Sequence, residues 1–352
     1  MHVSRFLSKL YEKLTPYTPG EQPRERAYIK LNTNESPYPP SPGVVAMKKE
    51  QLEDLRLYSD PEAHGLRRAL AQQYGVNPEN VHVGNGSDEV LNFAFMAYAT
   101  DGRGAAFADI TYGFYPVFAQ LNDIPVSIIP LREDFSLCPE DYFSLHQTIV
   151  IANPNAPTGL ALRLEQVEEI LLSNPDSVVI IDEAYVDFGA QSCVPLTKRY
   201  DNLLVVQTFS KSRSMAGARL GFAIGHADLI ADLERIRFST NPYNVNRLTL
   251  ALGETALQEQ SYYDENCKRI IATREACKAR FHQMGFVFPD SKANFLFVKK
   301  EGANGKLLYE ELKRKGVLVR HFEAPRLSDY NRITIGTPQQ MEVLFQCLEE
   351  IL

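Results

Sequence analysis

Between Val81 and Gly225 the sequence alternates short apolar runs with longer stretches in which leucine and isoleucine recur every three or four positions. The first pattern is typical of strands buried on both faces, and the second of amphipathic helices. Strands separated by helices predict a mostly parallel sheet with helices on both faces. The expected strands are VHVGNG, GAAFAD, VSIIPL, TIVIAN, SVVIIDE, NLLVVQTF and LGFAIG. Because the link between the last two is too short for a helical crossover, we expect that pair to be antiparallel.

Beyond Gly225 the pattern changes to longer helices, followed by three more strands. This pattern of helices followed by strands predicts a smaller α+β domain, and the length of 352 residues also favours two domains. Residues 1–40 are rich in proline towards their end and resemble an extended arm. We therefore expect an N-terminal arm that forms part of the small domain (1–40), a large domain (41–240) and a small C-terminal domain (241–352).

The composition is that of an ordinary globular protein, with 44% apolar and 23% charged residues. The net charge of -7 includes no basic block, which argues against nucleic acid and anionic membranes as partners and favours small molecules. The five cysteines form no CxxC pair and the histidines show no ligand spacing, so we expect neither disulfides nor a metal site. No long apolar run or signal peptide is evident, so we expect a soluble, cytoplasmic protein.

Polar residues follow several of the expected strands, where ligands bind in open parallel sheets. After the first strand, Gly86 makes a tight turn, and Ser87 and Asp88 open a helix whose free amides suit a phosphate. An ordinary helix cap explains these residues equally well. As a dinucleotide fingerprint the turn is weak, because Glu89 stands where a third glycine is expected.

Two further strand ends carry an aromatic residue and a polar turn. Tyr112 is placed to stack on a planar ligand, although an aromatic residue is more often part of the core. The turn NPNAPTG brings Asn153 and Asn155 to the mouth of the sheet, where a plain loop is the alternative interpretation.

Asp182 ends an apolar run, where an ionised carboxylate is costly unless a cation meets it. Lys211 follows a later strand and provides either a structural ion pair with Asp182 or a nucleophilic amine for an aldehyde, with Ser210 and Arg219 binding a phosphate. Pyridoxal 5'-phosphate fits the whole set: its aldehyde needs a lysine, its ring nitrogen a carboxylate, and its phenolate oxygen a donor such as Tyr185.

This ordered set of motifs resembles the fold-type I aminotransferases that use pyridoxal phosphate, over nearly the whole chain. Within that family the sequence is similar to the histidinol-phosphate aminotransferase subfamily. The motifs that carry the resemblance are LTPY, KLNTNESPYPPSP, LYSDP, GNGSDE, NPNAPTG, IDEAYVDF, TFSKSRSMAGARLG, PYNVNRLT, VLVRHF and NRITIGT. The resemblance implies a seven-stranded, mostly parallel sheet between helices, together with a smaller C-terminal domain.

The resemblance also assigns roles to the matching residues. Lys211 is implied as the amine that bonds the cofactor aldehyde and then moves the proton, Asp182 as the partner of the ring nitrogen, and Tyr185 as the partner of the phenolate oxygen. The other cofactor-binding residues that it implies are Gly86, Ser87, Asp88, Tyr112, Asn155, Ser210 and Arg219, with Tyr58 reaching in from the neighbouring subunit of a homodimer. The implied substrate-binding residues are Tyr17, Asn34, Arg320 and Arg332.

One position departs from the family pattern. The asparagine that usually binds the phenolate oxygen stands immediately before PTG, and Ala156 occupies that place. Asn155 or Asn153 is expected to supply the amide, unless Tyr185 acts without it.

The resemblance implies a transaminase that interconverts L-histidinol phosphate and 2-oxoglutarate with imidazole-acetol phosphate and L-glutamate. An aromatic or broad-range aminotransferase and a threonine-phosphate decarboxylase are alternatives on the same fold. A non-catalytic cofactor-binding module and a dinucleotide-dependent oxidoreductase are alternatives of other classes, and the second leaves Lys211, Tyr185 and Arg219 unexplained.

Overall fold

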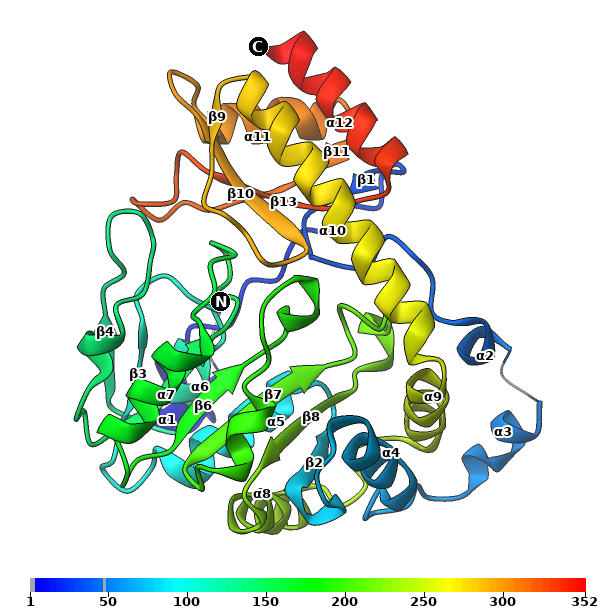
Figure 1. Ribbon diagram of the computed structural model, residues 1–352, viewed down its shortest axis with the longest axis vertical. Helices are drawn as coiled ribbons and strands as arrows, with labels where there is room; N and C mark the ends of the chain where they lie inside the picture. The colour runs from blue at the N-terminus through cyan, green and yellow to red at the C-terminus, as the bar shows by residue number, and fades with distance from the viewer. Residues whose placement is uncertain (1–3, 47–48) are drawn as a thin grey trace.

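A computed structural model of the chain describes residues 4–46 and 49–352. A seven-stranded sheet with its helices forms one half, a smaller sheet with two further helices forms the other, and the long helix α10 runs between them (Figure 1). The large sheet has the order β2-β8-β7-β6-β5-β3-β4. Its strands are β2 (Val81–Gly84), β3 (Ala105–Ala108), β4 (Val126–Ile129), β5 (Thr148–Ala152), β6 (Val179–Asp182), β7 (Leu203–Thr208) and β8 (Gly221–Gly225).

The seven strands coincide with the seven apolar runs, and the predicted fold class is confirmed. The strands β3 to β7 pair in parallel, whereas β8 is antiparallel to both of its neighbours, β7 and β2. The short link between β7 and β8 therefore does reverse the chain, as expected. The carboxyl ends of the parallel strands meet at one edge, where Asp182 ends β6.

Both faces of the large sheet are covered because its strands are apolar on both sides. Along β7, Leu203 and Val205 pack into one core cluster, whereas Leu204 and Val206 pack into another. Successive strand residues point to opposite faces, so this continuous apolar run requires helices on each. The helices that cover the first face include α4 (His64–Tyr74), α7 (Leu164–Ser173) and α9 (Arg247–Gln258), and those on the second are α5 (Ser87–Tyr98), α6 (Tyr115–Leu121) and α8 (Ala227–Thr240).

The smaller half contains an antiparallel sheet with the order β12-β13-β10-β9. Its strands are β9 (Phe286–Val287), β10 (Phe295–Lys300), β12 (Arg320–His321) and β13 (Asn331–Thr334), and its helices are α10 (Gln260–Gln283), α11 (Gly305–Arg314) and α12 (Pro338–Ile351). The first large core cluster extends past residue 240 to Tyr263, at the start of α10. The boundary at 240 remains a prediction.

The N-terminal segment joins the C-terminal part of the chain. Strand β1 (Ile29–Lys30) pairs in parallel with β11 (Val317–Leu318), and Leu31 belongs to the core of the smaller half. The segment VLVRHF does not form a single strand: it is split into β11 and β12, which pair with strands of different sheets. The remaining helices before residue 60 are short: α1 (Lys9–Glu12), α2 (Pro42–Val45) and α3 (Lys49–Glu53). No helix in the described ranges is both long enough and apolar enough to span a membrane.

Candidate active site

Two adjoining cavities open at the carboxyl edge of the large sheet. The first has a volume of about 210 Å³ and the second about 470 Å³. Side chains from distant strand ends and helix starts line the first cavity, including Ser87, Asp88, Tyr112, Asp182, Tyr185, Ser210, Lys211 and Arg219. The second is lined by residues of the N-terminal segment and the small sheet, including Tyr17, Asn34, Arg320 and Arg332. Lys211, Tyr112, Ala156 and Tyr185 border both.

Asp182 lies at the end of β6 and is 4% exposed. Its Oδ2 accepts a hydrogen bond from the Tyr115 hydroxyl at 2.9 Å, and its Oδ1 accepts one from the Ala184 amide at 3.2 Å. Burial raises the pKa of Asp182 to about 6, although the two hydrogen bonds oppose the increase. The carboxylate therefore faces the cavity without a strong cation partner of its own, and it fits a ligand that brings a positive charge.

Lys211 follows β7, and its Nζ donates to the Thr33 carbonyl at 3.2 Å and lies 5.9 Å from the centre of the Tyr185 ring. Among the described residues no ion pair joins Lys211 to Asp182, although both line the smaller cavity. The simple structural ion pair between them is therefore not what the structure shows. The amine faces a cavity that a ligand can fill.

The other end of the smaller cavity suits an anion. Helix α5 begins at Ser87 after Gly86, which has a φ of 82° and no side chain to cap the helix. A Cβ atom on Gly86 would lie 2.6 Å from Nη2 of Arg219 and would displace the guanidinium, and the positive φ itself favours glycine at this position. Arg219 donates to Asp88 at 2.7 Å, and Asp88 also accepts from the Tyr112 hydroxyl at 2.7 Å.

The donor set thus fits pyridoxal 5'-phosphate. An amine and a buried carboxylate lie in the same cavity as free helix-start amides, a serine hydroxyl and a guanidinium. Thr33, Thr208 and Tyr115 also contribute to this region and were missed by the sequence analysis. Tyr115 lies in an otherwise mostly apolar helix, where a buried hydroxyl needs a hydrogen-bond partner. This need is the feature of the sequence that could have identified it.

The two asparagines of the NPNAPTG turn point away from both of these cavities. Asn155 Nδ2 donates to the Ile110 carbonyl at 2.9 Å and to Thr158, and Asn153 Oδ1 accepts from the Leu162 amide at 2.8 Å. Both line a separate apolar cavity of about 170 Å³, whereas Ala156 borders the two site cavities. The expectation that Asn155 or Asn153 replaces the missing amide therefore has no support in their positions, because the Ile110 carbonyl and the Leu162 amide already bind the two side chains.

The larger cavity has two arginines at its base. Arg320 and Arg332 are directly opposite each other on the antiparallel strands β12 and β13. Arg320 donates to the Thr18 and Pro19 carbonyls at 3.2 Å each, and Arg332 donates to the Asn32 carbonyl at 3.0 Å. The Nε atom of Arg332 is buried and has no partner among the described residues. Like charges in cross-strand register are unfavourable, so the arrangement calls for an anion between them.

Tyr17 forms a wall of the larger cavity. Its ring stacks on Phe114 at 4.2 Å between centres and is tilted against Tyr112 at 6.3 Å. Burial raises the pKa of Tyr17, while Arg332 and Arg320 act in the opposite direction, so the hydroxyl stays protonated and can donate. Tyr17 therefore lines the same cavity as Arg320 and Arg332.

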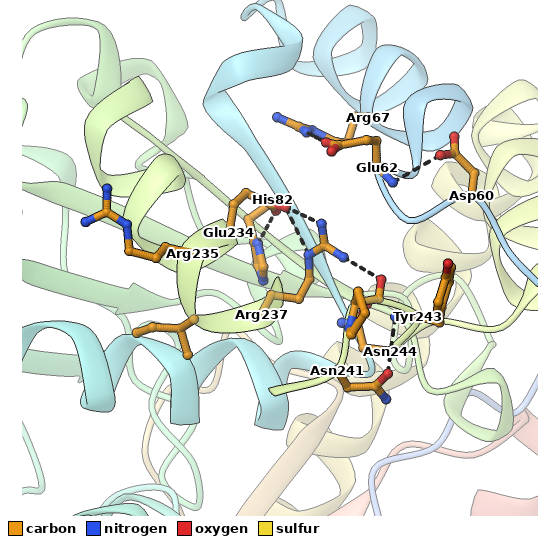
Figure 2. Close-up of polar contacts among 12 residues, drawn as sticks. Asp60, Glu62, Arg67, His82, Glu234, Arg235, Arg237, Asn241, Tyr243 and Asn244 are labelled. Carbon is orange, nitrogen blue, oxygen red and sulfur yellow. Dashed lines mark hydrogen bonds and ion pairs between the residues drawn. The ribbon is translucent and has the colours of Figure 1, made fainter. Parts of the chain in front are cut away.

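Tyr58 lies outside both cavities and is 78% exposed. Its ring stacks on Tyr243 at 4.6 Å between centres. Arg237 holds the chain next to Tyr243, because it donates to the Pro242 carbonyl at 2.8 Å. Arg237 also binds Glu234 (Figure 2).

Glu234 in turn binds His82, with 2.6 Å between the His82 Nδ1 and the nearer carboxylate oxygen (Figure 2). Burial opposes ionisation of Glu234, but the bonds to His82 and Arg237 lower its pKa to about 2. The exposed Tyr58 ring therefore rests on a firmly anchored segment. Leu52, Leu55 and Leu57, which are also exposed, precede it in the chain.

Comparison with known proteins adds three findings. The family model for aminotransferases of class I and II matches residues 26–348. The chain is 48% identical to a histidinol-phosphate aminotransferase from Brachyspira hyodysenteriae over 99% of each chain, and 50% identical to one from a Marinomonas species over 99% of this chain and 100% of that protein. The fold is similar to the crystal structure of a histidinol-phosphate aminotransferase from Sinorhizobium meliloti in complex with pyridoxal-5'-phosphate, with a TM-score of 0.88, 22% identity and coverage of 99% and 98% of the two chains.

Proposed function

This chain belongs to the class I and II aminotransferases, and from that premise we propose that it interconverts L-histidinol phosphate and 2-oxoglutarate with imidazole-acetol phosphate and L-glutamate. It is an aminotransferase, and its cofactor is pyridoxal 5'-phosphate. The observation that carries the proposed substrate is the cross-strand pair Arg320 and Arg332, which faces the same cavity as Lys211. Both amino donors, L-glutamate and L-histidinol phosphate, carry an anionic group at a distance from the amine.

When bound, the cofactor supplies an aldehyde that bonds amines and a ring that withdraws electrons from the substrate α-carbon. Asp182 would hold a proton on the ring nitrogen through its carboxylate, which Tyr115 orients. Ser210, Arg219 and the amides at the start of α5 would bind the cofactor phosphate. Tyr112 would stack on the ring, and Tyr185 would donate to the phenolate oxygen.

With the cofactor bound, Lys211 Nζ would take the proton from the substrate α-carbon and hold it for return at the end of the proton transfer. Two half-reactions share this machinery in a ping-pong cycle. L-glutamate gives up its amino group and leaves as 2-oxoglutarate, and imidazole-acetol phosphate accepts that group to become L-histidinol phosphate. Arg320, Arg332 and Tyr17 hold the anionic end of either substrate.

The proposed substrate is tested by a pair of compounds that differ only in the phosphate. We expect kcat/KM for L-histidinol phosphate to exceed that for L-histidinol by at least about 100-fold, because each charge-assisted hydrogen bond contributes roughly 1.5–3 kcal/mol. Replacement of Arg320 by glutamine is expected to reduce this ratio by about tenfold or more, with the exposed Arg163→Gln as a matched control. Equal rates for the two compounds, or faster turnover of phenylalanine, would refute the substrate, and carbon dioxide release from threonine phosphate would indicate the decarboxylase instead.

We also propose that the active unit is a homodimer in the cytoplasm, in which Tyr58 reaches the cofactor phosphate of the neighbouring subunit. The support is that the exposed Tyr58 ring stacks on Tyr243 and lies outside both cavities of its own subunit. Exposed leucines also precede Tyr58 in the chain. The five cysteines are unpaired, which suits a reducing compartment.

A mixing experiment tests the shared site. Lys211→Ala and Tyr58→Ala homodimers are each expected to have low activity, whereas subunit exchange between them should recover about one quarter of the wild-type specific activity, because half of the dimers are then mixed and each holds one intact site. The control mixes Lys211→Ala with Asp182→Asn, whose defects both lie in the subunit's own cavity, and should recover nothing. Equal recovery in the two mixtures, or none in either, would contradict the assignment of Tyr58.

A further inference from the structure

The hydroxyl of Tyr185 borders both cavities, and its hydrogen bonding is fixed from behind by the N-terminal segment. Asn34 Nδ2 donates to Tyr185 Oη at 2.9 Å. Asn34 is 1% exposed and lies 151 positions from Tyr185 in the sequence. Asn34 therefore contacts the site from a segment outside the motifs that contain Lys211, Asp182 and Tyr185.

The orientation of the Asn34 amide follows from its partner Thr334. The Thr334 hydroxyl oxygen accepts from the Asn34 backbone amide at 3.0 Å, and the same hydroxyl donates to Asn34 Oδ1 at 3.0 Å. A hydroxyl has a single proton, and here Oδ1 receives it. With Oδ1 facing Thr334, the amide nitrogen of Asn34 must face Tyr185.

The opposite orientation of the amide is unfavourable. It would place Nδ2 against Thr334, whose hydroxyl would then accept two hydrogen bonds and have no acceptor for its own proton among the described residues. Thr334 is 3% exposed, and leaving a buried hydrogen-bond donor without an acceptor is unfavourable. The Asn34 backbone is also held in place, because the Asn294 side chain donates to its carbonyl at 3.0 Å.

Tyr185 therefore accepts a hydrogen bond from Asn34, and its own proton has no acceptor among the described residues. Nearby, Ala156 presents only a methyl group to the two cavities that Tyr185 borders. We propose that Asn34, oriented by Thr334, is a positioning residue that commits the Tyr185 proton to the phenolate oxygen of the cofactor, a position to which Ala156 can offer no amide. The proposal rests on the proposed function, because it assumes that the cofactor binds with this oxygen towards Tyr185.

The substitution Asn34→Asp tests the proposal by reversing one hydrogen bond. The backbone of Asn34 has a φ of 57°, and aspartate tolerates this left-handed conformation about as well as asparagine does. A carboxylate can only accept, so the Tyr185 hydroxyl would turn towards it and cease to donate to the cofactor. We expect the pH midpoint of the visible absorbance of the cofactor-loaded protein to rise by about one to two units, since a hydrogen bond to a charged group contributes roughly 1.5–3 kcal/mol.

The introduced negative charge could raise the same midpoint by itself, and a double-mutant cycle separates the two causes. Tyr185→Phe removes the hydroxyl and should raise the midpoint on its own. If Asn34 acts through Tyr185, adding Asn34→Asp to Tyr185→Phe should produce less than about a third of the shift that it produces in the wild type. The same shift on both backgrounds would overturn the proposal, and so would no shift on either.

Thr334 provides a second route that introduces no charge. Thr334→Val keeps the shape of the side chain but frees the Asn34 amide to turn, so the midpoint should rise in the same direction by about half a unit or more. Thr334→Ser keeps the hydroxyl and should leave the midpoint unchanged. If the Thr334→Val and Thr334→Ser variants have the same pH midpoint, the proposal is contradicted, even if Asn34→Asp fails to fold. Failure of the wild type to bind the cofactor would instead refute the proposed function, and the two failures are thus distinguishable.

Discussion

Replacement of Lys211 by alanine is expected to lower transamination by at least about 10³-fold and to abolish the visible absorbance of the cofactor-loaded protein. Lys211 is the amine in the smaller cavity, and under the proposed function it serves both as the covalent partner of the cofactor and as the base at the substrate α-carbon. General acid–base catalysis alone contributes about 10²- to 10⁴-fold, so the loss of both roles exceeds the loss of one. Steady-state rates and absorption spectra at saturating cofactor measure the two effects.

Borohydride treatment gives an independent check of the same lysine. In the wild type, reduction should fix the cofactor to the peptide that contains Lys211, which mass spectrometry detects, and the alanine variant should carry no label. The control is Lys268→Ala, which alters a lysine whose side chain is 73% exposed on α10. A Lys211→Ala protein that keeps turnover within about tenfold of the wild type would contradict the assignment.

Asp182→Asn is expected to have opposite effects on activity and on stability. Turnover should fall by at least about 10²-fold, because a neutral amide cannot hold the proton on the ring nitrogen of the cofactor. The cofactor-free protein should become more stable at pH 7, because burial raises the pKa of Asp182 to about 6, so the ionised carboxylate is costly inside the fold.

The direction of the pH dependence follows from that raised pKa. The protonated carboxyl is favoured in the folded state, so its contribution is fully present below the ordinary pKa of 3.8 and is lost as the pH rises through about 6. A difference of about two pKa units corresponds to roughly 3 kcal/mol. Denaturant unfolding of the two cofactor-free proteins should therefore show that the asparagine variant has the higher free energy of unfolding, by up to that amount, at pH 7.5. This advantage should shrink as the pH falls from about 6 to about 4. An advantage that does not change with pH would show that packing, rather than ionisation, is responsible.

The local pattern of the sequence predicts the large sheet and one side of the site, because both depend on short stretches. Each buried strand is a continuous apolar run, and the polar residue that ends it must lie at the carboxyl edge of the sheet. Asp182 and Lys211 are therefore placed together because Asp182 ends β6 and Lys211 follows β7. The same reasoning predicts that β7 and β8 are antiparallel, from the length of one link.

Contacts between distant residues could not be predicted in this way. The hydrogen bonds that orient Asn34 come from Thr334, which is 300 positions away, and no periodicity in either segment relates the two. The direction of Asn155 depends on whether the Ile110 carbonyl needs a donor, which only the folded turn reveals. The sequence alone predicts Tyr115 as one more aromatic residue of the core, and only the structure shows that its hydroxyl donates to Asp182.

The pairing of the two ends of the chain has a consequence for synthesis on the ribosome. Most of the lining of the smaller cavity, from Ser87 to Arg219, is translated well before Arg320, Arg332 and Thr334. The larger cavity needs both residues 17–34 and these last strands, and Thr33 borders both cavities. The N-terminal segment must therefore wait, without its partner strand β11, for nearly the whole chain to emerge. Most of the lining of the smaller cavity is thus present in a nascent chain before the strands that complete the larger cavity have been translated.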